Sequence, residues 1–348
     1  MKHPITSSRI KVPRLDPGYR NQGSDKDAPC PRIFFIMLMT VIMHDVDSGM
    51  TEAEKECVES NRLHKEVNSR LFYADDTIIM SQTAEAAEIV LHRIQQESHK
   101  YALKLNETKC THIQMNAIQR IRFDNGTSVP TKTQTEYLGG KIKNDSSYKM
   151  EIQSRIGATW ATLRKLDLFW NKSPSSMKWK IIVYDAVIVT KLLYGLASVP
   201  LTRADCNKID AFQMRGLRKI LKIKHPYWSR VSNNQLLRIA NEKLGNEDKK
   251  IQRLSQRLIK KQITLYAHIL RESEEDPMKK ISINENGSRV KADFRRAGRP
   301  RTKWYDTTRK IIIIQLTTEG ILPQDPTRVM TKDEINHIIQ ECAEHRIL

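Results

Sequence analysis

The sequence predicts an α+β protein, in which a small antiparallel sheet with packed helices precedes an all-helical region. The sheet is predicted by two short β-prone runs that flank the adjacent Asp75 and Asp76. A helix is predicted next, because Thr83 can cap a segment whose apolar residues recur at helical spacing up to about Leu103. From Asp145 onward, helical spacing recurs almost without interruption.

The charge of the chain points to a polyanionic partner. The 348 residues carry a formal net charge of +19, and the sequence pI is about 9.7. An excess of this size favours nucleic acid as the partner. A protein that binds membrane surfaces is the alternative, but no amphipathic helix with aromatic residues on one face and lysines on the other stands out. The sequence therefore predicts no membrane partner.

The five cysteines are scattered along the chain, which argues against a disulfide framework. Their number is odd and none forms a Cys-x-x-Cys pair, so a zinc site is not indicated either. The N-terminal residues contain no apolar run of the kind found in signal peptides. We expect an intracellular, reducing location. The nucleus is compatible with the sequence, although the basic runs are too spread out to define a nuclear signal.

The first part of the chain divides into an irregular segment and a helix. Residues 1–29 are rich in Pro, Gly, Ser and charged residues, and they show no hydrophobic period. The apolar run from Ile33 to Met43 follows, within a segment that extends to about residue 47. This run is too short to span a bilayer and predicts a buried helix.

Asp75 and Asp76 are expected at a tight turn between the two predicted strands. Two like charges held side by side repel, and a divalent cation removes that conflict. Mg²⁺ takes carboxylate oxygens and substrate phosphates, and a rigid hairpin that offers two carboxylates is typical of two-metal phosphoryl or nucleotidyl transfer. A solvated turn is the alternative, since turns favour aspartate. The apolar flanks on both sides favour the metal site.

The segment Tyr73-Ala74-Asp75-Asp76, with its flanking residues, resembles the catalytic hairpin of reverse transcriptases of the non-LTR (LINE-like) retrotransposon branch. The resemblance continues in the same order along most of the chain. It implies a palm domain in which Asp75 and Asp76 are catalytic residues that bind Mg²⁺, with Tyr73 as a nucleic-acid contact. The implied partners are an RNA template and an RNA–DNA or DNA duplex, and a dNTP is implied as substrate only if the active site is completed.

Two further blocks extend the resemblance. Residues 103–110 resemble the next polymerase block, in which Lys109 would act catalytically by neutralising or protonating the leaving pyrophosphate; a solvated loop lysine is the alternative. Residues 135–142 resemble the primer-grip hairpin, whose glycines would let backbone approach backbone closely. The nucleic-acid contacts implied in this hairpin are Tyr137, Leu138 and Gly139.

Residues 145–247 resemble the helical thumb of these enzymes. Within them, a helix from about Arg203 to Lys222 combines an apolar stripe with a basic side that is expected to be exposed. Such a side suits contact with the backbone of a template–primer duplex, which is electrostatic and largely blind to sequence. An ordinary solvated face is the alternative. The predicted contacts are Arg215, Arg218, Lys219 and Lys222.

Residues 248–316 are predicted to form a basic C-terminal region that contacts nucleic acid, and residues 317–348 form a tail. Nine Lys or Arg and two Asp lie between Asn286 and Lys310. The segment 295–306 resembles a Gly-Arg-Pro-x-x-x-Trp signature of these elements and is interpreted as a basic tether to phosphates; insertion into a narrow minor groove and stacking on an unpaired base are the alternatives. The predicted contacts are Arg299, Arg301, Lys303 and Trp304.

The resemblance also implies a third catalytic carboxylate upstream, and no clear candidate for it is found. Only 74 residues precede Asp75, and Asp16, Asp25 and Asp27 do not lie in an apolar, β-prone context. Two-metal catalysis depends on a complete set of ligands. We therefore expect an N-terminally truncated fragment, with a partial palm at residues 30–144, that does not polymerise by itself.

Three functional interpretations stay open at this point. The first is an RNA-directed DNA polymerase of a non-LTR retrotransposon, which a partner chain would complete with the missing carboxylate. The second is a remnant that binds nucleic acid without catalysis, and this chain alone fits it better because of the incomplete ligand set. The third is a decayed reading frame that folds poorly.

Overall fold

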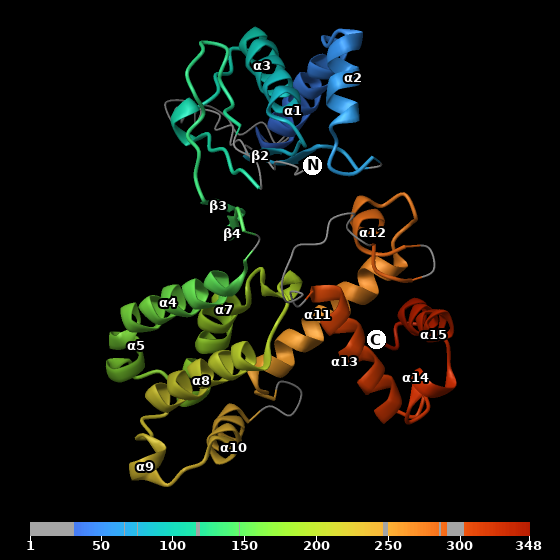
Figure 1. Ribbon diagram of the computed structural model, residues 1–348. Coiled ribbons are helices and arrows are strands. Elements are labelled where there is room, and N and C mark those ends of the chain that lie inside the picture. The colour runs from blue at the N-terminus through green and yellow to red at the C-terminus, as the bar shows by residue number, and fades with distance from the viewer. Residues whose placement is uncertain are drawn as a thin grey trace. The chain divides into compact units, whose positions relative to one another are not determined.

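The computed structural model describes residues 31–65, 67–74, 76–115, 119–145, 147–245, 250–284, 287–290 and 303–348. The chain divides into two compact units, unit 1 at Met1–Ser147 and unit 2 at Tyr148–Leu348 (Figure 1). Two small antiparallel sheets of two strands each occur together with many packed helices, which confirms the α+β prediction. The finer divisions predicted at residues 247 and 316 stay predictions.

Three helices form the core of unit 1. They are α1 (Pro31–Ser48), α2 (Glu52–Ser60) and α3 (Ala84–Lys100), and both α1 and α2 pack against α3. The side chain of Thr83 accepts a hydrogen bond from the backbone N–H of Ala86 and so caps α3, as the sequence predicts. The buried side chains of this core include Ile42 from α1, and Leu91 and Ile94 from α3.

The prediction that the apolar run in α1 is buried is right for only one face of the helix. Met39, Ile42 and Val46 are buried. The opposite face is exposed. The sequence cannot predict which face is covered, because the run is apolar around the whole circumference of the helix. The exposed side chains are Ile33, Phe34, Ile36, Met37 and Val41.

Membrane spanning was tested on the described part of the chain. Within it, no single helix has the length and apolar character needed to cross a bilayer. The pair 33–48 and 52–60 passes the test on length and composition together, with a bend of 106° between its two parts.

The first hairpin pairs β1 (Arg70–Tyr73) with β2 (Asp76–Ile79), and Tyr73 faces Asp76 across the closing pair. The turn lies one residue earlier than predicted, so Asp76 is the first residue of β2 rather than part of the turn. Ala74 in this turn has φ 51°, in the left-handed region. The rest of β2 is buried, and the guanidinium of Arg70 pairs with Asp47 of α1. The hairpin is therefore anchored on both strands.

The second hairpin pairs β3 (Gln134–Tyr137) with β4 (Gly140–Lys143), where the sequence predicts a hairpin. Its two turn residues, Leu138 and Gly139, have φ 48° and 74°. Two positive φ values in succession are typical of a type I′ turn, which matches the twist of a two-residue hairpin. The glycine is thus needed for backbone conformation, and not only for the close approach that the sequence suggests.

Among the described residues of unit 2, the regular elements are helices, and a single isolated antiparallel bridge joins Ile283 and Arg289. Its elements are α4 (Lys149–Lys165), α5 (Asp167–Lys172), α6 (Met177–Val183), the π-helical turn η2 (Tyr184–Val189), α7 (Thr190–Leu193), the 3₁₀ turn η3 (Leu196–Ser198), α8 (Arg203–Ile220), α9 (Pro226–Ser229), α10 (Asn233–Leu244), α11 (Leu254–Arg271), α12 (Pro277–Ser282), α13 (Trp304–Thr318), α14 (Pro326–Val329) and α15 (Lys332–Glu344).

Two hydrophobic cores stabilise unit 2, and α11 contributes to both. Its first turns place Leu254 and Leu258 in a core with residues of α4, η2, α7, α8 and α10. Its last turns place Tyr266, Ile269 and Leu270 in a second core with residues of α13 and α15. Figure 1 shows α11 as a long helix that passes from the neighbourhood of α8 to that of α13.

The first of these cores contains an unusually close contact between a helix and an aromatic ring. Tyr184, at the start of η2, is buried and lies against Gly216 of α8. A Cβ atom added at Gly216 would lie 2.7 Å from the Tyr184 hydroxyl and about 3 Å from two ring carbons. Glycine at this position therefore lets the ring approach the helix backbone.

Candidate active site

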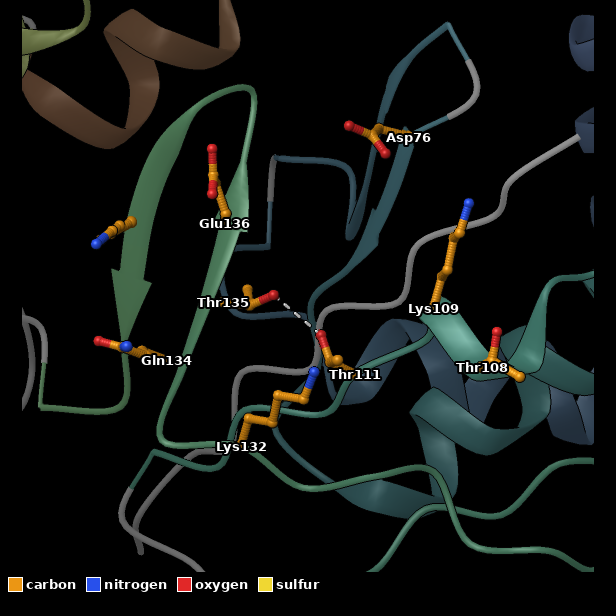
Figure 2. Close-up of a pocket in the computed structure, with 9 residues that line it drawn as sticks. Asp76, Thr108, Lys109, Thr111, Lys132, Gln134, Thr135 and Glu136 are labelled. Carbon is orange, nitrogen blue, oxygen red and sulfur yellow. Dashed lines mark hydrogen bonds between the residues drawn. The ribbon is translucent and has the colours of Figure 1, made fainter. Parts of the chain in front are cut away.

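A cavity of about 550 Å³ in unit 1 collects residues from three separate stretches of the chain. The first stretch is β2, the second is the 3₁₀ turn η1 (Glu107–Lys109) with the residues after it, and the third is the β3–β4 hairpin. The lining residues are Asp76, Thr108, Lys109, Thr111, Lys132, Gln134, Thr135, Glu136 and Lys141 (Figure 2). We call this cavity the Asp76 pocket.

Asp76 lines the pocket from the start of β2 and is partly exposed. The next residues, Thr77 to Ile79, are buried, so the strand holds the carboxylate in a fixed place at the edge of the core. Asp75, the other predicted metal ligand, lies outside the described residues. Tyr73, which faces Asp76 across the hairpin, is 63% exposed and does not line the pocket.

Lys109 lines the same pocket as Asp76, although 33 positions separate them in the sequence. The backbone N–H of Lys109 donates to the carbonyl of Asn106 at 3.0 Å, which closes the short turn. The next residue, Cys110, is completely buried and fixes the end of that turn. Figure 2 shows the Lys109 side chain extending from η1 towards the level of Asp76. The structure thus brings two of the predicted catalytic residues to one cavity.

The β3 strand forms another wall and is tied to the segment after η1. The hydroxyls of Thr111 and Thr135 are 3.1 Å apart and share a hydrogen bond (Figure 2). The backbone of His112 makes two further hydrogen bonds to the segment before β3. Its carbonyl accepts from the N–H of Lys132 at 2.8 Å, and its N–H donates to the carbonyl of Pro130 at 2.9 Å. These bonds position the hairpin residues that face the cavity.

Two pocket residues on this wall, Lys132 and Glu136, were not among the predicted site residues. Residues 131–136 are all polar, and Thr135, between Gln134 and Glu136, also lines the pocket. No alternation of polar and apolar positions therefore identifies Lys132 and Glu136 from the sequence. The predicted primer-grip residues of the hairpin turn lie elsewhere and do not line the pocket: Tyr137, Leu138 and Gly139.

The charges around the pocket suit a polyanion together with a cation. Two carboxylates, Asp76 and Glu136, and three lysines, Lys109, Lys132 and Lys141, line it. Within the described ranges, no group of three or more His, Cys, Asp or Glu side chains is placed to hold a metal ion. Mg²⁺ is nevertheless commonly held by one or two carboxylates, with water and substrate phosphates completing the shell, and the oxygen donors present are of that kind.

His112 follows the pocket residue Thr111 in the chain and is completely buried. Neither of its ring nitrogens has a hydrogen-bond partner. Burial disfavours the charged imidazolium and lowers the pKa of His112 to about 4. This residue is therefore neutral in the folded chain at neutral pH.

Acidification is expected to destabilise the protein through His112. Between its ordinary pKa near 6.5 and the folded value near 4, the unfolded chain binds a proton that the folded chain does not, so the free energy of unfolding falls as the pH falls. The loss reaches about 3 kcal/mol once the pH is below 4, and about 2 kcal/mol of it develops between pH 7 and pH 5. Denaturant unfolding at pH 7 and pH 5 measures this second part. His112→Phe should flatten the dependence, and the exposed control His99→Gln should not; an equal dependence in all three proteins would contradict the assignment.

The basic side predicted for α8 is only partly exposed. Arg215 and Lys222 are exposed, and the ammonium of Lys219 forms an ion pair with Asp167 at 2.6 Å. Arg218 was predicted among the exposed residues, and this is wrong: it is 7% exposed. Its guanidinium donates hydrogen bonds to the loop that follows α8, which folds back over the helix.

The residues predicted to contact nucleic acid in the C-terminal region differ in their structural surroundings. Arg299 and Arg301 lie outside the described residues. Lys303 is exposed immediately before α13. Trp304, for which stacking on a base was one of the alternatives, packs its ring near Tyr266 with centroids 6.0 Å apart, and its indole N–H donates to the carbonyl of Ala197 at 2.7 Å. Trp304 therefore anchors the start of α13.

A segment of unit 1 matches a known protein family. A search of curated proteins finds none that matches the chain. The family model described as reverse transcriptase (RNA-dependent DNA polymerase) matches residues 33–142. All residues that line the Asp76 pocket lie inside this segment. The segment that builds the pocket is therefore similar to the domain of reverse transcriptases, the RNA-directed DNA polymerases that act on a nucleic-acid template.

Proposed function

We propose that the Asp76 pocket is the nucleotidyl-transfer site of an RNA-directed DNA polymerase of the non-LTR retrotransposon type. The observation that carries this proposal is that Asp76 and Lys109 line one cavity inside the segment that matches reverse transcriptases. The resemblance of segments beyond that match, at 145–247 and 295–306, supports the retrotransposon type.

Asp76, with its neighbour Asp75, is proposed to bind Mg²⁺. When bound, the ion supplies positive charge to the transferring phosphoryl group and lowers the pKa of the primer hydroxyl. Carboxylates suit this ion because Mg²⁺ prefers hard oxygen ligands. The buried remainder of β2 gives the Asp76 carboxylate the fixed position that this role requires.

Lys109 is proposed to assist the leaving group. In the reaction the 3′ oxygen of the primer bonds to the α-phosphorus of the dNTP, and the bond from that phosphorus to the pyrophosphate oxygen breaks. Negative charge develops on the departing oxygen, and an ammonium group beside it neutralises that charge or gives it a proton. Lys132 and Lys141, which line the same pocket, are proposed to attract the triphosphate into it.

Substitution of Lys109 by Met tests this assignment. We expect the rate of single-nucleotide addition to a primer on an RNA template to fall by about 100-fold or more, as is usual when a general acid is lost. Lys109→Arg should retain more of the rate, because it keeps the charge. Lys104→Met is the matched control, since Lys104 is exposed and nearby but does not line the pocket. Equal rates for the Lys104 and Lys109 variants would remove Lys109 from the mechanism.

A second candidate function is nucleic-acid binding without catalysis. It is favoured by the charge of unit 2, where residues 211–241 contain seven Lys or Arg and no Asp or Glu. Under this alternative the chain adds no nucleotide with Mg²⁺ but still binds a primer–template duplex, with an affinity that falls steeply as salt rises. Measurement of extension and duplex binding on the same preparation separates the two functions.

A further inference from the structure

The connection between α8 and α10 presents two aromatic rings on the surface of unit 2. Tyr227 is 64% exposed and Trp228 is 74% exposed, both on the short helix α9. Their rings are in edge contact, with centroids 5.0 Å apart and an interplanar angle of 88°. Two large rings side by side at this exposure form a surface for stacking rather than a part of the core.

The fold fixes the loop on both sides of these rings. The buried guanidinium of Arg218 donates to the carbonyl of Lys224, before the aromatic pair, at 3.2 Å, and to the carbonyl of Val231, after it, at 2.7 Å. It also donates to the side-chain oxygen of Asn233 at 3.2 Å. A single buried side chain thus closes the loop, and the rings are held in place before any ligand binds.

Helix α9 itself is held by His225. Its ring nitrogen Nδ1 accepts a hydrogen bond from the backbone N–H of Tyr227 at 3.3 Å, and its carbonyl accepts from the N–H groups of Trp228 and Ser229 at 2.9 and 3.0 Å. The backbone that carries both rings is therefore ordered by local hydrogen bonds. This order lowers the entropic cost of a contact made by the rings.

The surroundings of the rings are strongly basic. The guanidinium of Arg230 lies 5.7 Å from the centroid of the Tyr227 ring, and Lys222 and Lys224 are exposed close by in the sequence. No Asp or Glu occurs from residue 211 to 241. An aromatic pair whose neighbours in the chain include several cations and no carboxylate is suited to a ligand that has flat apolar faces and negative charges at regular spacing.

We propose that Tyr227 and Trp228 form a stacking site for unpaired bases of single-stranded nucleic acid, and that Lys222, Lys224 and Arg230 bind the phosphates beside those bases. In a duplex the faces of the bases already stack on their neighbours, so exposed rings gain a partner only from a single strand. A membrane surface is less suited, because α9 has four residues and cannot lie along a bilayer as an amphipathic helix does. The site lies in unit 2 and does not depend on the activity proposed for the Asp76 pocket.

The test is binding of the full-length chain to a fluorescently labelled 12-nucleotide oligo(dT), followed by anisotropy. Trp228→Ala and Tyr227→Ala are each expected to weaken binding by about 5- to 150-fold, which corresponds to loss of one stacked base. Trp228→Phe should retain most of the affinity, since it keeps a ring. The matched control is Trp179→Ala, which removes another exposed tryptophan of unit 2 and should leave the affinity unchanged.

Three outcomes would overturn the proposal. The first is unchanged oligo(dT) affinity in both Tyr227→Ala and Trp228→Ala. The second is an equal loss of affinity for oligo(dT) and for a blunt DNA duplex, which would show a contact that is not specific for single strands. The third is that Tyr227→Ala or Trp228→Ala loses binding to vesicles of phosphatidylserine and phosphatidylcholine but keeps its binding to oligo(dT). Because both rings are exposed, thermal unfolding should be unchanged in the variants, and this measurement verifies that they fold.

The phosphate contacts have a separate signature in the same assay. Each of Lys222→Met and Lys224→Met should reduce the slope of log affinity against log salt by about one unit at most, because each removes a single contact to phosphate. Trp228→Ala should lower the affinity without changing this slope. A change of slope in Trp228→Ala equal to that of the lysine variants would contradict the division of roles between rings and cations.

Discussion

In a preparation of the chain that extends a primer on an RNA template with Mg²⁺, Asp76→Asn is expected to reduce this extension by about 1,000-fold or more. The Lewis-acid contribution of a catalytic metal is worth several kcal/mol, and each 1.36 kcal/mol corresponds to a factor of ten in rate. Asparagine has nearly the same shape as aspartate but offers no charged oxygen to the ion. Incorporation of a single labelled dNTP at several Mg²⁺ concentrations measures the effect.

The control for this substitution is Asp124→Asn. Asp124 lies in an exposed turn of the same unit, and its carboxylate accepts a hydrogen bond from the side chain of Gln95 at 2.8 Å, which an asparagine oxygen can also accept. Asp124→Asn thus removes one negative charge from unit 1 without touching the pocket. Affinity for the primer–template duplex should be unchanged in both variants. Extension by Asp76→Asn at the rate of the unsubstituted chain would show that the pocket is not the catalytic site.

Gly216→Ala is expected to lower the free energy of unfolding of unit 2 by about 1–3 kcal/mol, the usual cost of an overpacked core. The added methyl group would lie 2.7 Å from the hydroxyl of Tyr184, and the neighbouring ring carbons are almost as close. The ring is buried and belongs to the core around α8, so it has little room to move away. Denaturant unfolding followed by helical circular dichroism measures the change.

Gly157→Ala is the same chemical change and is expected to have the opposite effect on stability. Gly157 lies inside α4, and an added Cβ there would meet no atom within 4 Å. Alanine favours a helix over glycine by about 0.8–1.0 kcal/mol, so this variant should be more stable than the unsubstituted chain. If both alanine variants changed stability in the same direction, the contact between Gly216 and Tyr184 would not be the cause.

Local patterns predict those parts of the fold that depend on neighbours in the sequence. The cap at Thr83, the two hairpins and the helical character of unit 2 all follow from residues a few positions apart. The exposed face of α1 does not follow, because a run that is apolar on every side carries no information about which side is covered. Burial of Arg218 likewise depends on a loop that returns over its own helix.

The sequence likewise predicts only part of the candidate site. Asp76 and Lys109 are found from the chemistry of a carboxylate pair and from a resemblance, and the fold places both in one cavity. Glu136 and Lys132 could be assigned to the site only once the structure showed that the second hairpin faces that cavity. Trp304 was assigned to a ligand because of its basic neighbours in the sequence, whereas its indole is bonded to Ala197, more than 100 positions away. Contacts over such distances are not encoded in any local pattern.

The position of α11 has a consequence for how unit 2 loses its structure. A helix is stabilised along its length by hydrogen bonds between successive turns, so its two halves are not independent. Because one half of α11 belongs to each core, melting of the C-terminal helices would leave Tyr266 and Leu270 without their packing partners and fray the helix towards Leu258. The two cores are thereby coupled thermodynamically, and unit 2 should unfold in one cooperative transition although its apolar interior is divided.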